Sequence, residues 1–336
     1  MKRVLVTGGQ GFIGSYLCKE LLDNGYEVYS VDDFSKYGSV VRAHDKHPHF
    51  HLIKGDVKRL EYELEVNRLE GKFKQFDYII ALAAKIGGIS YFHQFAYDLF
   101  SENEGIMKAT YDFAVKYPPK KVVVISSSMV YEETSVFPTP ENEVSWCLTP
   151  SSSYGRQKLV CEWWAKAAYE QYKIPYTIVR PFNAVGVGED KALGDSEITS
   201  GNIKLMLSHV LPDLVNKCLQ GQNPLHILGD GKQIRCYTNG KDIARGIRLA
   251  MESPNTINDD FNISVEQPTS VLELAEKVWN KINPDKPFEY ICDEPFEYDV
   301  RIRQPSIEKS KKLLKFEANI SLDDSIQEVI DYMKTK

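Results

Sequence analysis

The amino-acid sequence predicts an α/β fold in which a parallel sheet carries helices on both faces. Six short apolar or β-favouring runs recur through the first 180 residues, as expected of parallel strands that are buried on both faces. They cover residues 4–7, 27–31, 50–54, 77–82, 121–125 and 176–180. Segments with helical apolar spacing alternate with these runs, and a glycine-rich turn follows the first run. The pattern is that of a Rossmann-type doubly wound parallel sheet, and the change of texture after residue 180 predicts a smaller C-terminal α/β substrate-binding lobe.

The composition argues against several classes of protein. Of the 336 residues, 43% are hydrophobic and 26% are charged, which indicates a folded globular chain. The net charge of −6, with no basic run, disfavours nucleic-acid binding. No stretch approaches the ~18 apolar residues of a membrane span, and no signal peptide precedes the first strand, so we expect a cytoplasmic protein. The six cysteines lack paired spacing, which predicts reduced thiols and no metal site.

The turn after the first strand is the first candidate binding site. Glycine at Gly8, Gly11 and Gly14 lets the turn close, lets a diphosphate approach the backbone and lets the helix pack against the strand. Phe12 and Ile13 open that helix, whose positive N-terminus would hold the phosphates. The plainer alternative is that these glycines form a sharp turn with no ligand. The place of the turn between a strand and a helix favours a dinucleotide site.

An acidic pair, Asp32-Asp33, ends the second strand about 20 residues after the glycines. A carboxylate at Asp32 can accept hydrogen bonds from both ribose hydroxyls of adenosine, and it would repel a 2′-phosphate. We therefore expect NAD and not NADP. Lys36 and Arg42 keep the alternative open, since either could in principle serve a phosphate.

Two later strand ends extend the predicted cofactor site. Asp56, followed by Val57, lies just past the third strand, where it could hydrogen-bond the adenine amino group or cap the next helix. The fourth strand continues into Leu82, Ala83, Ala84 and Lys85. The small residues leave room for a flat ligand, and the lysine could reach a diphosphate.

Four histidines, at positions 44, 47, 49 and 51, have irregular spacing. We therefore expect a solvated loop there and no metal site.

A serine cluster and a tyrosine–lysine pair carry the predicted chemistry. Serines 126–128 end the fifth strand, and Tyr154 and Lys158 follow in a helical segment. Since the tyrosine and the lysine are four residues apart, they share one face of the helix. The lysine ammonium stabilises the phenolate, so the tyrosine can take the proton of a carbinol while hydride leaves to nicotinamide. The spacing alone is common, but the glycine turn and the acidic strand end favour this interpretation.

With these residues in place, the sequence resembles the extended short-chain dehydrogenase/reductase family, in its group of nucleotide-sugar epimerases and dehydratases. The matching residues span the first half in the family's order: Gly8, Gly11, Gly14, Asp32, Asp56, Ala83-Ala84-Lys85, Ser127 with Val130-Tyr131, Tyr154 with Lys158, and Arg180-Pro181-Phe182-Asn183. The resemblance implies that Tyr154 is the acid/base, that Lys158 supports it and binds ribose, and that the Ser127 hydroxyl contacts the substrate oxygen. Ser126 and Ser128 are the alternatives to this serine. The implied NAD site comprises Gly8, Gly11, Phe12, Ile13, Gly14, Asp32, Asp56, Val57, Leu82, Ala83, Ala84, Lys85, Tyr154, Lys158 and Pro181.

Departures from the family pattern narrow the reaction. The 4,6-dehydratases of the family follow the catalytic hydroxyl residue with Asp-Glu, whereas this chain has Ser128 and Met129, which supply neither acid nor base. Residues 84–89 and 208–212 are similar to segments of GDP-fucose synthases, which use a Cys and a His beside a ketone. His209 matches that His, but Met129 stands at the Cys position, which disfavours double epimerisation. The NADPH preference of those enzymes also conflicts with the acidic pair at the second strand end.

The remaining reaction is C4 epimerisation of a UDP- or GDP-hexose through a transient 4-keto sugar. It needs only Tyr154, a tightly held NAD and room for the sugar to rotate. The alternatives in the same fold are a nucleotide-sugar 4-reductase or dehydrogenase and a 3,5-epimerase-reductase. An alternative of another class is a non-catalytic NAD-binding scaffold or sensor.

The second half is predicted to hold the substrate. Arg235 lies in a segment that resembles the family's Gly-Asp-Gly…Arg-Asp-Tyr pattern, and its guanidinium fits a diphosphate bidentately. Asn183 is expected to hydrogen-bond a phosphate or the sugar. The family also places an arginine at Arg301, with Arg303 as a second candidate. The full expected substrate set is Ser128, Asn183, His209, Arg235 and Arg301.

We expect residues 1–180 to form the NAD-binding domain, with a return segment at about 230–255. Residues 181–229 and 256–336 would form the substrate-binding lobe, with the substrate in the cleft at the strand carboxyl ends. The remaining long helices are predicted near 98–117, 154–172, 205–219, 271–282 and 322–333. By the family resemblance the first two form a homodimer interface through Trp163, Trp164 and Tyr169. The alternative is that these side chains pack within one chain.

Overall fold

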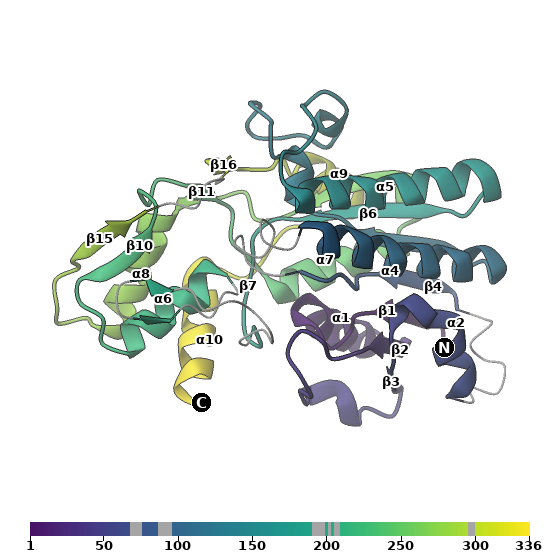
Figure 1. Ribbon diagram of the computed structural model, residues 1–336, viewed down its shortest axis with the longest axis horizontal. Helices are drawn as coiled ribbons and strands as arrows, with labels where there is room; N and C mark the ends of the chain where they lie inside the picture. The colour runs from purple at the N-terminus through teal and green to yellow at the C-terminus, as the bar shows by residue number, and fades with distance from the viewer. Residues whose placement is uncertain (68–75, 87–95, 190–198, 201–202, 205–208, 295–299) are drawn as a thin grey trace.

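In the computed structural model, seven parallel strands form the central sheet, in the order β13-β6-β5-β4-β1-β2-β3 (Figure 1). The structure describes all residues except 68–75, 87–95, 190–198, 201–202, 205–208 and 295–299. The strands are β1 (Arg3–Thr7), β2 (Glu27–Asp32), β3 (Phe50–Lys54), β4 (Tyr78–Ala81), β5 (Lys121–Ile125), β6 (Tyr176–Pro181) and β13 (Asp259–Ile263). The predicted doubly wound sheet is confirmed. Its seventh strand, β13, was not predicted from the sequence.

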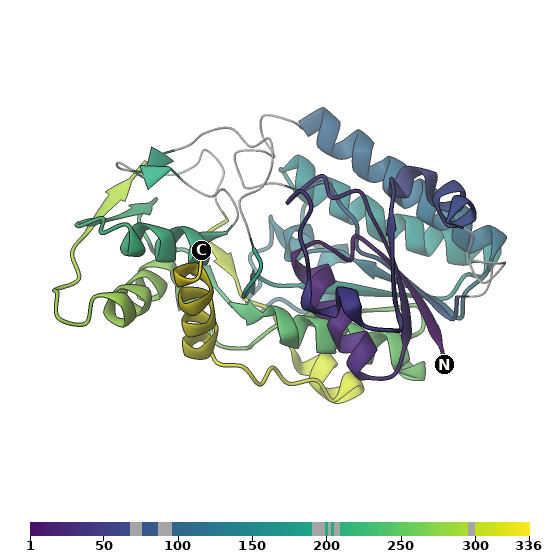
Figure 2. The same cartoon turned by 90° about the horizontal axis from the view of Figure 1, so that it is seen from below.

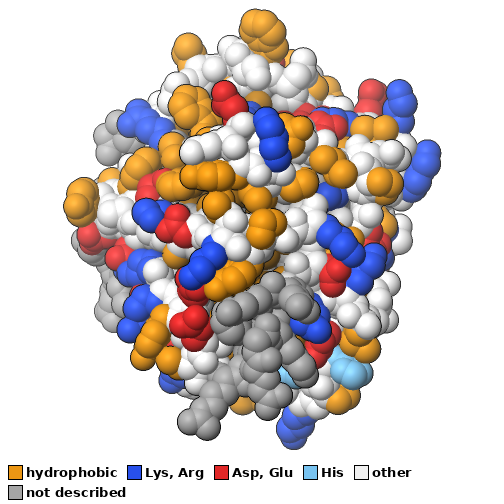
Figure 3. All heavy atoms as spheres, turned by 90° about the vertical axis from the view of Figure 1, so that its right-hand side faces the viewer, with side chains coloured by type: hydrophobic (Ala, Val, Ile, Leu, Met, Phe, Trp, Pro, Cys, Tyr) orange, Lys and Arg blue, Asp and Glu red, His pale blue; other side chains and the backbone are white. Residues whose placement is uncertain are grey.

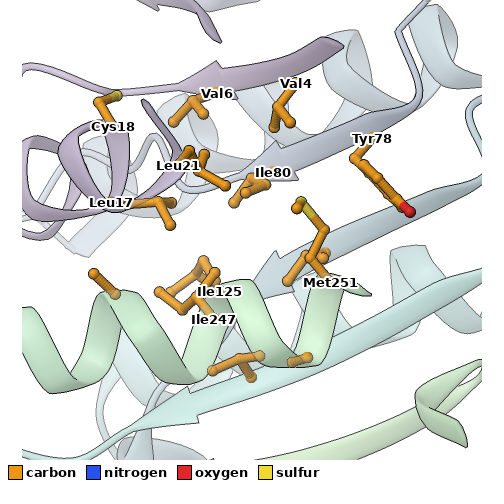
Figure 4. Packing of buried hydrophobic residues seen from close by; sticks show 14 of the residues in the cluster. Val4, Val6, Leu17, Cys18, Leu21, Tyr78, Ile80, Ile125, Ile247 and Met251 are labelled. Carbon is orange, nitrogen blue, oxygen red and sulfur yellow. The ribbon is translucent and has the colours of Figure 1, made fainter. Parts of the chain in front are cut away.

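Each face of the sheet carries its own hydrophobic core. The helices on the two faces are α1 (Phe12–Asp23) and α7 (Gly240–Glu252) on one side, and α2 (Leu60–Val66), α4 (Ala96–Lys116) and α5 (Ser153–Tyr172) on the other. Val4 and Val6 pack with α1 and α7, as Figure 4 shows, whereas Leu5 between them belongs to the core under α2, α4 and α5. Because side chains alternate along a strand, a continuous apolar run is required when both faces are covered.

A second lobe stands beside the sheet (Figures 1 and 2). It consists of α6 (Val210–Leu219), α8 (Val271–Ile282), α10 (Leu322–Lys334), the pair β10 (Leu225–Leu228) and β15 (Tyr290–Asp293), and the three strands β14 (Thr269–Ser270), β11 (Ile234–Arg235) and β16 (Ile302–Arg303). Leu214, Trp279 and Ile330 lie in its core. The short elements are β7 (Ala184–Val185), β12 (Thr238–Asn239), β8 (Thr199–Ser200), β9 (Ile203–Lys204), η1 (Ala43–Lys46), η2 (Val57–Arg59), η4 (Ser128–Tyr131), η5 (Glu141–Ser145) and η6 (Pro254–Thr256).

After α7 has packed on the sheet, the chain returns to it a second time beyond residue 255. Strand β13 lies at one edge of the sheet, beside β6, and α9 (Glu308–Leu314) packs on it. Leu314 and Phe316 complete the core around α7. We therefore propose that residues 259–263 and 308–316 belong with the NAD-binding domain and not with the substrate-binding lobe.

The outer faces of α4 and α5 combine buried and exposed aromatic residues. The ring of Trp164 stacks on Tyr111 with 6.3 Å between centroids, and its indole N–H donates to Glu104 Oε2 at 2.7 Å. Trp164 therefore packs within its own chain, whereas Trp163 and Tyr169 are exposed. Figure 3 shows hydrophobic side chains gathered in a band between charged residues at one end of the molecule. Among the described parts of the chain, no helix is both long enough and apolar enough to cross a membrane.

Candidate active site

A cavity of about 520 Å³ lies between the two lobes. The first lobe contributes the ends of its parallel strands, and the second contributes α6, β10 and β11. This is the place where doubly wound folds bind their ligands, at the carboxyl ends of the strands. The cavity wall includes the predicted residues Gly8, Gly11, Phe12, Ile13, Gly14, Asp32, Asp56, Val57, Leu82, Ala83, Ala84, Lys85, Ser127, Ser128, Tyr154, Lys158, Pro181, Asn183, His209 and Arg235.

The three glycines of the turn meet different constraints. Gly8 has a φ of +77°, and a Cβ there would lie 2.8 Å from the Cα of Ala83. A Cβ on Gly14 would lie 2.2 Å from the carbonyl oxygen of Gly8. Glycine is therefore required at positions 8 and 14, because any side chain there would clash with the chain's own backbone. At Gly11 a Cβ would meet only that same oxygen, at 3.3 Å, and the residue lines the cavity. Its missing side chain keeps space on the ligand side.

The N-terminus of α1 is open to the cavity. Its N-cap is Gly11, with no side-chain cap and no acidic residue in the first turn. The first helical residues, from Phe12 to Gly14, line the cavity. The unpaired amides and the positive end of the helix dipole are suited to a diphosphate. The cradle therefore fits a dinucleotide such as NAD.

Asp32 is held by two backbone amides. Its Oδ2 accepts from Gln10 N and its Oδ1 from Phe34 N, both at 2.9 Å. Burial raises the pKa of this carboxyl, and these amides oppose the shift. Each oxygen retains a lone pair, so ribose hydroxyls can still donate to it. Arg42, the alternative phosphate ligand, instead donates to the carbonyl of Gln10 at 2.9 Å. The positions of Asp32 and Arg42 fit NAD better than NADP.

The segment after β4 is fixed by two buried polar residues that the sequence analysis missed. Thr7 Oγ1 accepts from the amides of Leu82 and Ala83, each at 3.1 Å. The Asn103 side chain accepts from Lys85 N at 2.6 Å and donates to Lys85 O at 3.0 Å. A threonine that ends an apolar strand and an asparagine inside a helix are the signals that could have identified them.

Asp56 makes the interaction expected of a helix cap. Its Oδ1 accepts from Lys58 N at 2.9 Å, at the start of η2. The residue also lines the cavity. Helix capping thus uses one of the two carboxylate oxygens of Asp56. Contact of Asp56 with the adenine of the cofactor stays a prediction.

The predicted catalytic residues converge where β5 meets α5. Lys158 Nζ lies 5.8 Å from the ring centroid of Tyr154 and donates to Ile125 O at 3.0 Å. Tyr154 is buried against Leu99 and Met129. The side chain of Ser152 caps α5 by accepting from Gly155 N at 3.0 Å, which fixes the first turn that carries the tyrosine.

Two of the three serines have separate hydrogen-bond partners. Ser126 Oγ donates to Glu162 Oε1 at 2.6 Å, within the buried interior. Ser127 Oγ accepts from Met129 N at 3.2 Å and so keeps its own proton for another acceptor. All three serines reach the cavity wall. Because Ser126 is committed to Glu162, the geometry favours Ser127 over it as the hydroxyl for the substrate oxygen.

The strand ends rest on a buried ion-pair network, here called the Arg180 network. The Arg180 guanidinium binds both oxygens of Glu162 at 2.7 Å and Asp260 Oδ2 at 2.7 Å, and it donates to Tyr131 OH at 2.5 Å. Although burial opposes it, Arg180 and Lys309 hold the pKa of Asp260 below its usual value. The network links α5, β6, β13 and α9 directly behind the serines.

The second lobe meets the cavity with longer side chains. Arg235 and Arg303 are paired neighbours on β11 and β16, and both line the cavity. Asn183 has a φ of 30°, and its Oδ1 is buried without a hydrogen-bond partner among the described residues. Backbone strain with an unpaired buried acceptor is typical of a binding position. His209 contacts the carboxylate of Glu189, a buried partner that the sequence analysis missed.

Arg301 does not lie where the family resemblance suggested. Its guanidinium forms a two-pronged pair with Asp230, at 2.9 Å to each carboxylate oxygen, and the side chain is exposed. It is not part of the cavity wall. The ion pair holds it at the surface, whereas Arg303 lines the cavity, so a role of either arginine in binding a ligand stays a prediction.

Two of the four histidines at positions 44–51 pack against aromatic rings of the fold. Burial lowers the pKa of His44 to about 4, and its ring packs edge-on against Phe50. His51 stacks on Tyr29 with 4.3 Å between centroids. These two are therefore structural and not part of a wholly solvated loop. Within the described residues, no group of three or more His, Cys, Asp or Glu side chains could hold a metal ion.

Comparisons with known proteins identify relatives of the whole chain. The family model described as the NAD dependent epimerase/dehydratase family matches residues 4–264. A relative from Methanocaldococcus jannaschii named putative UDP-glucose 4-epimerase is 29% identical over 332 residues, which cover 98% of each chain. The UDP-N-acetyl-alpha-D-glucosaminuronate decarboxylase of Bacillus cytotoxicus is 28% identical over 342 residues, 99% of this chain and 98% of its own.

A solved structure with its ligands is also similar. The UDP-glucuronic acid 4-epimerase of Bacillus cereus, in complex with UDP-glucuronic acid and NAD, has a TM-score of 0.79 and 26% identity, over 99% of both chains. The similarity therefore extends over both lobes and over the cavity between them.

Proposed function

The chain belongs to the NAD dependent epimerase/dehydratase family, and on that premise we propose that it interconverts the C4 epimers of a UDP-hexose. The observation that carries the proposal is the placement of Tyr154, Lys158 and Ser127 together at the end of β5, on the wall of the cavity. The nucleotide follows the relatives whose names specify a UDP-sugar.

Tyr154, Lys158 and Ser127 have separate roles in the proposed reaction. NAD, when bound, accepts a hydride from the sugar carbon and can return it. Tyr154 removes the proton of the 4-hydroxyl as the hydride leaves, which gives a 4-keto sugar, and it returns that proton after the sugar has turned. The Lys158 ammonium stabilises the phenolate, and the Ser127 hydroxyl donates to the substrate oxygen.

Met129 argues against a reaction that needs a further acid or base beside Tyr154. Its thioether packs against Tyr154 at the position where an acid or base would be needed to remove water or a proton beside the ketone. Ser128 next to it is also a poor acid or base. A dehydratase is therefore disfavoured.

The second lobe would bind the nucleotide part of the substrate. Arg235 and Arg303 are placed to hold the diphosphate, and Asn183 to accept a hydrogen bond from the sugar. The cavity of about 520 Å³ would have to leave the 4-keto sugar room to present its other face.

Two further aspects are proposals about the whole protein. The exposed Trp163 and Tyr169 on α5, with Tyr97 and Phe100 on α4, offer an apolar surface for a homodimer. All six cysteines are free thiols, which suits a reducing compartment such as the cytoplasm.

The test is turnover without added cofactor. The purified protein is incubated with UDP-glucose, UDP-glucuronic acid and a GDP-hexose, and the products are followed by proton NMR. Appearance of the C4 epimer of a UDP-sugar supports the proposal. Accumulation of NADH would indicate a dehydrogenase, loss of the carboxylate of a UDP-uronic acid would indicate a decarboxylase, and no turnover of any sugar would refute it.

A further inference from the structure

Arg42 lies where three parts of the molecule meet. Its guanidinium donates to the carbonyl of Gln10, in the glycine turn, at 2.9 Å. The same guanidinium reaches the carbonyl of Gly188, at the edge of the second lobe, at 3.4 and 3.5 Å from its two terminal nitrogens. Arg42 itself belongs to residues 33–46, which make up most of the segment between β2 and β3. One side chain thus joins the glycine turn, this segment and the second lobe.

The first-lobe end of this connection is rigid. Asp45 accepts from Arg42 N at 2.7 Å with one oxygen and from Gln10 Nε2 at 2.9 Å with the other. Gln10 N donates in turn to Asp32. Gln10 is therefore held through its amide, its side chain and its carbonyl. These bonds fasten residues 33–46 to the turn that holds the dinucleotide.

The second-lobe end is shaped to receive Arg42. Gly188 has a φ of +91°, and a Cβ there would lie 2.7 Å from Arg42 Nη1. Two residues earlier, Gly186 leaves space for Tyr16, whose hydroxyl accepts from Val187 N at 2.7 Å. The backbone at 186–188 thus has no side chain at the two positions that meet Tyr16 and Arg42. Close approach of this kind requires glycine.

The segment closed by Arg42 forms one end of the cavity. Residues 33–38 and Val40 line it, next to Gln10 and Gly11. We propose that Arg42 is a clamp that retains the bound NAD: the cofactor leaves past residues 33–46 only after the guanidinium has released Gly188 or Gln10. This rests on the proposed epimerase reaction, which needs the same cofactor to return the hydride that it took. Retention would spare the enzyme an exchange of cofactor in each cycle.

The test measures cofactor release directly. Arg42→Met keeps the length of the side chain and removes every donor, and Arg42→Lys keeps the positive charge but loses the planar, forked guanidinium that spans the two carbonyls. Arg59→Met is the control, because it makes the same change at an exposed arginine on η2. Among the described residues, Arg59 pairs with Glu63 and makes no hydrogen bond or ion pair with Gln10 or Gly188. NADH is loaded onto each variant, and its loss of fluorescence is followed after a chase with excess NAD.

Loss of one charged hydrogen bond predicts that Arg42→Met releases NADH about tenfold faster and carries less NAD through purification. Arg42→Lys should lie between this variant and the parent, and Arg59→Met should equal the parent. With saturating NAD, kcat should stay within about twofold, so that only the apparent affinity for NAD changes. Release from both Arg42 variants at the rate of the parent would overturn the clamp. A failure of the epimerase proposal would leave the release rates unaffected, so the two can be told apart.

Discussion

The two lobes line one cavity by different means. The first lobe presents groups that are fixed by backbone: strand ends, a glycine turn and the first turn of α5, with the Arg180 network behind them. The second lobe presents long side chains from strands of two residues, such as β11 and β16. We therefore propose that the first lobe performs the chemistry, which needs fixed distances, and that the second lobe recognises the nucleotide sugar.

The largest expected effect concerns the chemistry of the first lobe. Tyr154→Phe removes the hydroxyl that exchanges the proton and leaves the ring packed against Leu99 and Met129. We expect turnover to fall by about 10³-fold. NAD content and UDP affinity should remain within about twofold, measured by absorbance and by isothermal titration calorimetry. Turnover above a tenth of the parent would show that another group serves as acid/base.

A second effect tests whether the buried charges hold the first lobe together. Glu162→Gln leaves the Arg180 guanidinium with one charged partner fewer in the interior, and we expect a loss of about 3–5 kcal/mol in the free energy of unfolding. Urea denaturation measures it. The control is Asp230→Asn, which weakens the exposed pair with Arg301 and should leave the unfolding curve unchanged. Equal effects of the two variants would remove the contrast between the lobes.

The sequence predicted the first lobe in detail because its constraints are local. The strand that enters Gly8, the acid that ends β2 and the spacing of Tyr154 and Lys158 are each set within a few residues of chain. The sequence missed β13, because its run Asp259–Ile263 begins with two acids. Those acids are explained only by Arg180 and Lys309, which the fold brings to them.

Other features depended on contacts between distant parts of the chain. Thr7 and Asn103 fix the segment after β4 from positions far apart in the sequence. The different positions of Arg301 and Arg303 also depend on such a contact, because Asp230 pairs with Arg301 at the surface, whereas Arg303 lines the cavity. Neither the strand pattern nor the family pattern contains this information. The roles of the site residues stay predictions that the variants described here test.

A third effect concerns the pH dependence of stability in the first lobe. Lys121 is buried, and burial lowers its pKa from 10.5 to about 8. Its ammonium donates to Ala250 O, Ser253 O and Thr256 Oγ1 at 2.7–3.0 Å. Below pH 8 the lysine is charged in both states, so it adds no pH dependence. Between about pH 8 and 10.5 the folded protein has released a proton that the unfolded chain still holds, so raising the pH stabilises the fold.

Comparison with Lys121→Met isolates this contribution from other titrating groups. The advantage of the parent over this variant in unfolding free energy should grow by about 2 kcal/mol across that range, once solvent screening is allowed for. Lys120→Met, at the exposed neighbouring lysine that pairs with Asp77, is the matched control and should show no such trend. A difference that does not change with pH would mean that the ammonium is not desolvated by the fold.

The smallest expected effect decides what the second lobe does. Arg235→Ala removes one guanidinium from the cavity wall, and Arg301→Ala removes one from the surface. If recognition lies in the second lobe, the first variant should raise KM for the UDP-sugar about tenfold, as the loss of one charged hydrogen bond predicts, with kcat nearly unchanged. The second should change neither constant. A fall in kcat for Arg235→Ala would instead mean that this arginine also positions the sugar for the chemistry at Tyr154, and the division of labour between the lobes would not hold.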